Sequence, residues 1–160
     1  MTRVRNLAAA GLLLLAAAPP ARADITAFIG ANTTPANRQV RGAALGIGLL
    51  VVGFEGEYGF TPDDPRATAP SLKTGMGNVL LQTPGAFFGV QPYFTTGAGF
   101  YQEKLDTHSH TGFGVNTGGG VKINLLGPLR LRVDYRIFKL GSGALYSPAH
   151  RFYAGLNLKF

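Results

Sequence analysis

The residues with the most obvious chemistry lie in one short polar segment. Asp106, His108 and His110 alternate along the chain, with Thr107 and Ser109 between them. In an extended segment the three side chains point the same way, and imidazole and carboxylate are ligands that suit zinc or copper. Nothing in the sequence supplies a fourth ligand or fixes the geometry. We therefore favour a solvated polar loop over a metal site, and we expect no cofactor.

A hydrolytic site is the second possibility, and it needs a nucleophile, a base and an acid that orients the base. Ser109 stands between two histidines, but neighbours in a strand point to opposite faces. Ser147 and His150 lie near each other in the sequence without an obvious carboxylate. Because the third partner is missing in both places, we expect no enzyme activity.

A third candidate is the carboxylate pair Glu55 and Glu57, which has the composition of an acid–base site. A buried charge needs a partner of opposite sign. Arg130, Arg132 and Arg136 share one face of a later segment that alternates in the same way. We expect the two glutamates to neutralise these arginines rather than to carry out catalysis.

The elements that would position these residues begin after the first 23 residues, which have the pattern of a secretory signal peptide. Two arginines precede an apolar run, and small residues flank a cleavage site before Asp24. Cleavage there leaves one domain, residues 24–160. It removes three of the 15 Lys and Arg residues and none of the 8 Asp and Glu residues, so the net charge falls from +7 to +4. With no basic arm or basic helix, we expect no nucleic-acid binding.

Apolar and polar residues alternate through the rest of the chain, which is typical of β-strands. In the last predicted strand, Phe152 and Phe160 share one face, and Arg151 and Lys159 share the other. The facing of the fourth strand stays open, because residues 79–81 are all apolar. We predict eight strands, at residues 25–33, 39–49, 51–60, 72–82, 88–101, 111–124, 129–139 and 150–160.

The predicted connections alternate between short and long, which is the hairpin pattern of an outer-membrane barrel. Short turns then face the periplasm, long loops face outward, and an even number of strands places both chain ends on the periplasmic side. We predict short connections near Leu50, at 83–85 and at 126–128, long loops at 61–71, 102–110 and 140–149, and an intermediate loop at 34–38.

The polar face of the strands decides what lies inside the barrel. Eight strands enclose a space only wide enough for side chains, and glycines at inward positions such as Gly42 and Gly120 make room for long ones. A soluble lipocalin-like carrier is the alternative, and it would place apolar residues inside. We expect a charged lumen network of Glu55, Glu57, Lys122, Arg130, Arg132, Asp134 and Arg136.

The end of the chain carries a more specific pattern. Tyr153, Gly155, Leu158 and Phe160 resemble the C-terminal assembly signal of outer-membrane proteins, with hydrophobic residues spaced by two and an aromatic residue at the end. Across residues 24–160 the chain resembles the small eight-stranded barrels of the OmpA and OmpX type, without the periplasmic peptidoglycan-binding domain. This resemblance implies an all-β, antiparallel, up-and-down transmembrane β-barrel.

The same resemblance implies a place and a set of partners. The place is the outer membrane of a Gram-negative-type bacterium, and the partners are outer-membrane lipid, lipopolysaccharide and the barrel-assembly machinery. We favour a monomer, although the sequence leaves the oligomeric state open. We expect a structural or surface-interaction role carried by the outward loops. A narrow porin-like channel and a lipid A-modifying enzyme are the alternatives.

Overall fold

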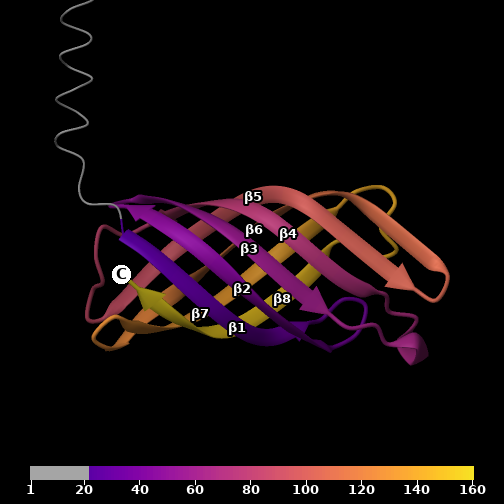
Figure 1. Ribbon diagram of the computed structural model, residues 1–160, viewed down its shortest axis with the longest axis horizontal. Helices are drawn as coiled ribbons and strands as arrows, with labels where there is room; N and C mark the ends of the chain where they lie inside the picture. Colours follow the sequence, from indigo (N-terminus) through magenta and orange to yellow (C-terminus); the bar gives the residue numbers. More distant parts are fainter. Residues whose placement is uncertain (1–21) are drawn as a thin grey trace, which may run out of the picture.

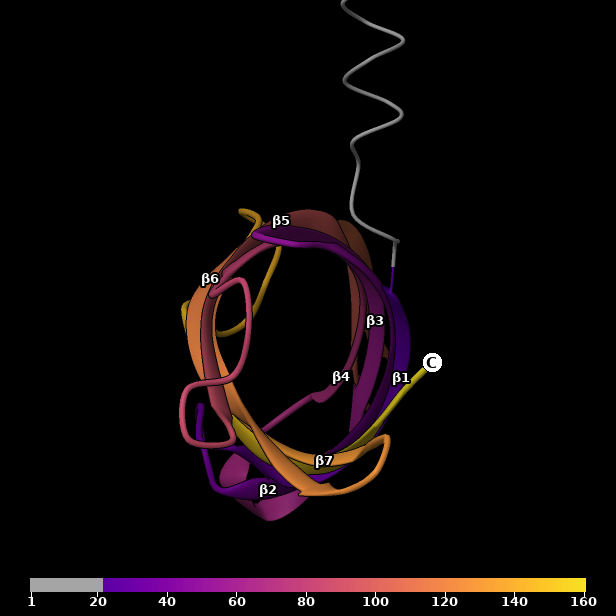
Figure 2. The same cartoon turned by 90° about the vertical axis from the view of Figure 1, so that its left-hand side faces the viewer.

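The computed structural model describes residues 22–160, and the predicted signal peptide lies outside this part except for Arg22 and Ala23. Eight antiparallel strands form one closed barrel in sequence order, with β8 paired to β1 (Figures 1 and 2). This confirms the predicted fold. The strands are β1 (Arg22–Asn32), β2 (Arg38–Leu49), β3 (Val52–Thr61), β4 (Ser71–Gln82), β5 (Val90–Leu105), β6 (His108–Leu126), β7 (Leu129–Leu140) and β8 (Ala149–Lys159).

The barrel has two unlike ends. At the terminal end β1 begins and β8 ends, beside the connections 50–51, 83–89 and 127–128 (Figure 1). At the loop end lie the connections 33–37, 62–70, 106–107 and 141–148. The 3-10 helix η1 (Pro65–Ala67) lies within the second of these.

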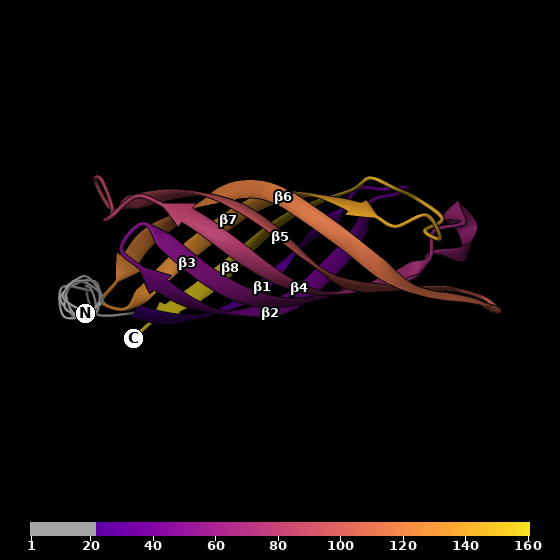
Figure 3. The ribbon, with the colours of Figure 1, turned by 90° about the horizontal axis from the view of Figure 1, so that it is seen from above.

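Two predicted connections were wrong. Residues 102–110 form no long loop, because the alternation continues through them and β5 and β6 extend beyond the rest of the loop end (Figure 3). Only Asp106 and Thr107 make the turn, and the φ of Asp106 is +49°. The connection after β4 is longer than predicted, because Phe88 and Gly89 have φ angles of +51° and +81° that an extended strand does not allow.

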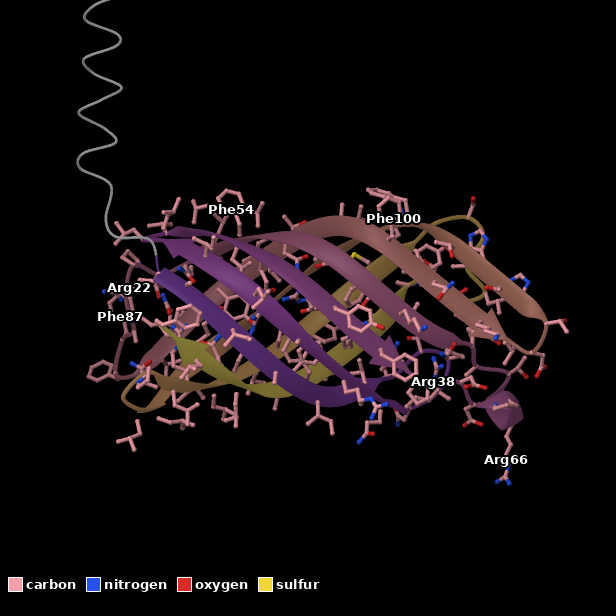
Figure 4. All side chains as sticks on the ribbon, in the orientation of Figure 1. Arg22, Arg38, Phe54, Arg66, Phe87 and Phe100 are labelled. Atoms are coloured by element: carbon pink, nitrogen blue, oxygen red, sulfur yellow. The ribbon has the colours of Figure 1, made fainter. Side chains whose placement is uncertain are left out.

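Large apolar side chains cover the outside of the barrel. Phe54 and Phe100 project outward from the strands (Figure 4), with exposed fractions of 54% and 67%. In β4, Leu81 is exposed whereas Leu80 is buried, which settles the facing that the sequence left open. An apolar exterior around a polar interior is the pattern of a transmembrane barrel and the reverse of a soluble carrier. The carrier alternative is therefore wrong.

No helix within residues 22–160 has the length and apolar character needed to cross a membrane.

Inward glycines leave the space that the large lumen side chains occupy. A Cβ atom on Gly42 would lie 2.4 Å from the ring of Phe28, which itself stacks on Tyr153 with 4.1 Å between ring centroids. A Cβ atom on Gly120 would lie 2.6 Å from the hydroxyl of Tyr93. The glycines on β2 and β6 thus make room for bulky neighbours, as predicted.

Candidate functional site

The middle of the lumen holds a group of buried charges, which we call the central cluster. Its members come from β3, β7 and β8, and their side chains point inward because each alternates with an outward apolar residue. All are at most 5% exposed. The central cluster consists of Glu55, Glu57, Arg132, Asp134, Arg136 and Arg151.

Arg132 and Arg136 both bridge the same two carboxylates. Arg132 donates hydrogen bonds to both oxygens of Glu55, and its Nη2 lies 3.1 Å from Oδ2 of Asp134. Arg136 Nη2 lies 2.8 Å from Oε1 of Glu55, and Arg136 Nε lies 3.0 Å from Oδ1 of Asp134. Each arginine is therefore held from two strands, β3 and its own β7.

Glu57 receives the remaining arginine. Arg136 Nη1 and Arg151 Nη1 each lie 3.1 Å from one of its oxygens. Arg151 also donates to the hydroxyl of Thr74 at 3.0 Å, and the hydroxyl of Tyr153 donates to Glu57 at 3.2 Å. With three carboxylates facing three guanidinium groups, the central cluster is electrically neutral.

Tyr93 of β5 completes this network. Its hydroxyl donates to Asp134 and accepts from Nε of Arg132 at 2.7 Å. Hydrogen-bonded chains of this kind strengthen one another where water is excluded, and they hold a single arrangement. In chemical terms, the central cluster consists of guanidinium groups and carboxylates that pair with one another across the lumen.

A second group of charges lies between the central cluster and the terminal end, and we call it the mouth cluster. Its members are Asp24, Lys122, Arg130 and Lys159. Oδ2 of Asp24 lies 2.8 Å from Nζ of Lys122 and 3.1 Å from Nη2 of Arg130. Arg130 also donates from Nε to Asn157 at 2.7 Å.

The expected pairing of Arg130 with Glu55 or Glu57 does not form. Arg130 pairs with Asn157 in the register of β7 and β8, two positions nearer the terminal end than Arg132. It therefore reaches Asp24 of β1 instead. Lys122, the other residue of the expected network outside the central cluster, makes the same contact.

The mouth cluster borders a cavity of about 100 Å³ at the terminal end. Arg22, Lys122, Arg130 and Lys159 line it together with Asp24. Toward the central cluster the adjoining space shrinks to about 10 Å³, near the limit for one water molecule.

The loop end is closed in a different way. Leu72, Met76, Tyr101, Phe138, Leu140 and Ala149 pack into an apolar layer inside the barrel. Arg38 donates to the carbonyls of Thr34 at 2.9 Å, Pro62 at 3.1 Å and Pro70, so it ties two loops together (Figure 4). Glu103 accepts a hydrogen bond from the backbone N–H of Leu145 at 2.8 Å and so holds a third loop, residues 141–148.

The predicted metal candidates do not come together. Asp106 lies in the turn, His108 and His110 lie on β6, and the His110 ring faces that of Tyr101 at 5.9 Å. Within the part of the chain that the structure describes, no group of three His, Cys, Asp or Glu residues is arranged to hold a metal.

The serine and histidine near the loop end are each engaged elsewhere. The Ser147 hydroxyl accepts from the backbone N–H of Leu140 at 3.0 Å and donates to its carbonyl at 3.3 Å. Nδ1 of His150 lies 2.7 Å from the hydroxyl of Tyr135. None of these contacts joins Ser147 to His150 or to a carboxylate, as a catalytic triad requires.

The C-terminal residues divide between the two faces. Tyr153 and Gly155 face the lumen, and Leu158 and Phe160 face outward with exposed fractions of 42% and 72%. The backbone of Phe160 pairs with Ala23 through bonds of 3.0 and 2.9 Å.

Sequence reasoning missed two lumen residues, Asp24 and Tyr93, and one lumen contact, that of Arg151 with Glu57. Asp24 precedes the outward Ile25, so strand alternation was the signal that could have placed it inside.

Solved structures of similar fold are small outer-membrane barrels. The N-terminal barrel of OprF from Pseudomonas aeruginosa aligns with a TM-score of 0.66 and 18% identity, over 87% of this chain and 97% of that one. Neisserial surface protein A aligns with a TM-score of 0.65 and 17% identity, over 88% and 96%. The outer-membrane enzyme PagL aligns with a TM-score of 0.54 and 14% identity, over 86% and 98%. At these identities the likeness concerns the fold alone.

No curated protein sequence matches the chain. A family model does match, over residues 7–160, and its description is the outer membrane protein β-barrel domain. The apolar exterior, the closed eight-stranded barrel and the charged lumen agree with that match. The chain belongs to the outer membrane protein β-barrel domain family.

Proposed function

We propose that this protein is a non-enzymatic component of the outer membrane, with a closed barrel that carries interacting loops. The neutral central cluster carries the proposal. Its arginines are almost fully buried, and each contacts carboxylates from other strands. On its terminal side the adjoining free space is about 10 Å³, and on its loop side lies the apolar layer. This arrangement supports a lumen filled by side chains rather than a water path.

Planar-bilayer recording tests the closed lumen against the narrow porin-like channel. We expect the purified protein to give no stable unit currents under conditions in which a known open porin conducts. Roomy aqueous channels need about 16 strands. Stable unit currents that disappear when the protein is omitted would establish the channel instead.

A lipid A-modifying enzyme is the second alternative, because one protein of similar fold, PagL, is an enzyme. The bonds of Ser147 to Leu140 and of His150 to Tyr135 support a non-enzymatic role. Incubation with lipopolysaccharide followed by mass spectrometry of its acyl chains tests this. We expect an unchanged acyl profile, and a shortened or extended profile would establish the enzyme.

Lipopolysaccharide is the lipid partner that we propose. Arg41, Lys73, Lys104 and Lys139 are exposed on outward positions of strands near the loop end. Within residues 22–160 no Asp or Glu faces outward from a strand. Cations at this level suit anionic lipid headgroups. In nanodiscs, we expect lipopolysaccharide to raise thermal stability more than phosphatidylcholine, and less so in the Lys73→Gln/Lys139→Gln variant.

Export and assembly complete the proposal. We infer cleavage before Asp24, and mass spectrometry of the membrane-fraction protein tests it directly. We also infer that the barrel-assembly machinery reads the last strand, where Phe160 is outward and exposed. Phe160→Ser should lower the amount of assembled protein far more than the turn-proximal control His108→Ala. Equal amounts of the two variants would count against this role.

A further inference from the structure

We propose that the cavity at the terminal end of the lumen binds one phosphate-type oxyanion. The first argument is the balance of charge. Among residues 22–160, Asp24 is the one carboxylate that lines the cavity, whereas Lys122, Arg130 and Lys159 all line it. The mouth cluster therefore carries two positive charges in excess. This count leaves out Arg22, a fourth lining cation that the inferred cleavage would remove, and the α-ammonium group that the same cleavage would create on Asp24.

The second argument is burial. Lys122 is 4% exposed and Arg130 is 7% exposed, so both cations are largely removed from water. A buried charge without a partner is costly, and one carboxylate cannot neutralise both. The central cluster meets this requirement with equal numbers of each sign, whereas the mouth cluster meets it only when an anion enters the cavity.

The third argument is the supply of hydrogen-bond donors. The ammonium group of Lys122 has three N–H donors, of which Asp24 takes one. Arg130 has five, and three of its nitrogens are bonded to Asn157, Gln91 and Asp24. Donors that converge from β6, β7 and β8 suit an oxyanion with several acceptor oxygens.

The fourth argument is size. A cavity of about 100 Å³ accommodates one small oxyanion, and the space beyond it narrows to about 10 Å³. Lys159, which lines the cavity, is the last residue of β8, at the terminal end of the barrel. The ligand therefore enters from that end and stops at the central cluster. Both free phosphate and a lipid headgroup at the adjoining membrane surface have the required chemistry.

Calorimetric titration with inorganic phosphate tests the site. We expect the purified protein in neutral detergent to bind one phosphate per chain, against a background of sodium chloride at constant ionic strength. Lys159→Gln should weaken the phosphate affinity about tenfold, because one charge-assisted contact is lost. Arg66→Gln removes an exposed cation of η1 at the loop end, outside both clusters, and serves as the matched control, with unchanged affinity.

Three results would overturn the site: no saturable binding, equal binding in the parent and Lys159→Gln, or an equal loss in Arg66→Gln. Circular dichroism of each variant shows whether the barrel is folded. If Lys159→Gln fails to fold, phosphate-induced NMR shifts in the unmodified protein replace it. We expect these shifts at the backbone amides of Lys122 and Arg130 and not at Arg66, and the reverse pattern overturns the site.

A second arm identifies the source of the phosphate group. The same titration is run in nanodiscs of phosphatidylglycerol and of phosphatidylcholine. Weaker phosphate affinity in phosphatidylglycerol that persists at high ionic strength, where the membrane's surface charge is screened, would show that an anionic lipid headgroup competes for the cavity. Equal affinity in both would assign the site to a soluble phosphate. The outcome is independent of whether the lumen conducts or the loops bind a partner.

Discussion

The central cluster and the mouth cluster share the strands β7 and β8 but differ in charge balance. Arg132 and Arg130 are two residues apart on the same face of β7. Arg132 has Glu55 and Asp134 as partners, in a cluster of zero net charge. Arg130 shares Asp24 with Lys122, beside a cavity. The difference indicates that burial alone does not decide the role of such an arginine. The number of carboxylate partners distinguishes an arginine that stabilises the barrel from one that can bind a ligand.

Arg132→Leu should have the largest effect on stability. Among residues 22–160 it leaves Glu55, deep in the lumen, with Arg136 as its one ion-pair partner, beside a hydrogen bond from Asn78. Removing one partner of a buried ion pair typically lowers the free energy of unfolding by about 3–5 kcal/mol. Urea unfolding in lipid vesicles, followed by circular dichroism, measures the change.

The matched control is Arg130→Leu, on the same face of the same strand. Asp24 keeps Lys122 in this variant, and the cavity admits water, so we expect a distinctly smaller loss. If the two variants lost equal stability, the proposed distinction between the clusters would be wrong.

The sequence alone predicted the lumen facing of several charged side chains, because strand alternation reports the facing of each residue. Glu55, Glu57, Arg132 and Arg136 lie inside for that reason. It did not predict which charges meet across the barrel. That depends on the register between strands, which the alternation leaves free in steps of two residues. Arg130 was therefore assigned to the wrong carboxylates, and Asp24 was overlooked.

Two connections escaped prediction for local reasons. Residues 102–110 contain enough polar residues for a loop, but Tyr101 and Glu103 of β5 face inward and pair with β6. Strand geometry beyond the membrane allows polar residues on both faces, so composition misleads there. The left-handed backbone of Phe88 lengthens the other connection, and a phenylalanine in the sequence does not indicate such a backbone conformation.

Gly120→Ala should have the second-largest effect on the free energy of unfolding. Together with Gly48→Ala, it compares how tightly the two clusters are packed. A Cβ atom at Gly120 would lie 2.1 Å from the carbonyl oxygen of Val133, a backbone atom, and close to Tyr93. Overpacking of this kind costs about 1–3 kcal/mol. At Gly48, which lines the cavity, the nearest atom is the flexible end of Gln82 at 3.0 Å.

We therefore expect Gly48→Ala to change the free energy of unfolding by less than Gly120→Ala. Both variants are measured by the same urea titration in lipid vesicles. A larger loss in Gly48→Ala would mean that the mouth is as tightly packed as the centre.

Asp24→Asn should have a smaller effect that depends on the solution. The variant removes the one carboxylate of the mouth cluster but keeps an oxygen that accepts from Lys122 and Arg130. We expect a loss of about 1–2 kcal/mol, because hydrogen bonds to charged groups are only partly weakened. Phosphate at constant ionic strength should recover part of this loss by supplying negative charge to the cavity. A loss that phosphate leaves unchanged would argue against an anion in the mouth.

The smallest expected effect is the coupling free energy between one substitution in each cluster, measured with a double variant. Lys159→Gln lies at the edge of the mouth cluster and shares no hydrogen-bond partner with Arg132 among residues 22–160. Independent sites add within about 0.3–0.5 kcal/mol, whereas residues in one network couple by about 0.5–3 kcal/mol. We expect Arg132→Leu and Lys159→Gln to add, and Arg132→Leu and Glu55→Gln to couple. Strong coupling in the first pair would mean that the two clusters act as one network, and that the excess charge at the mouth is balanced from within the barrel.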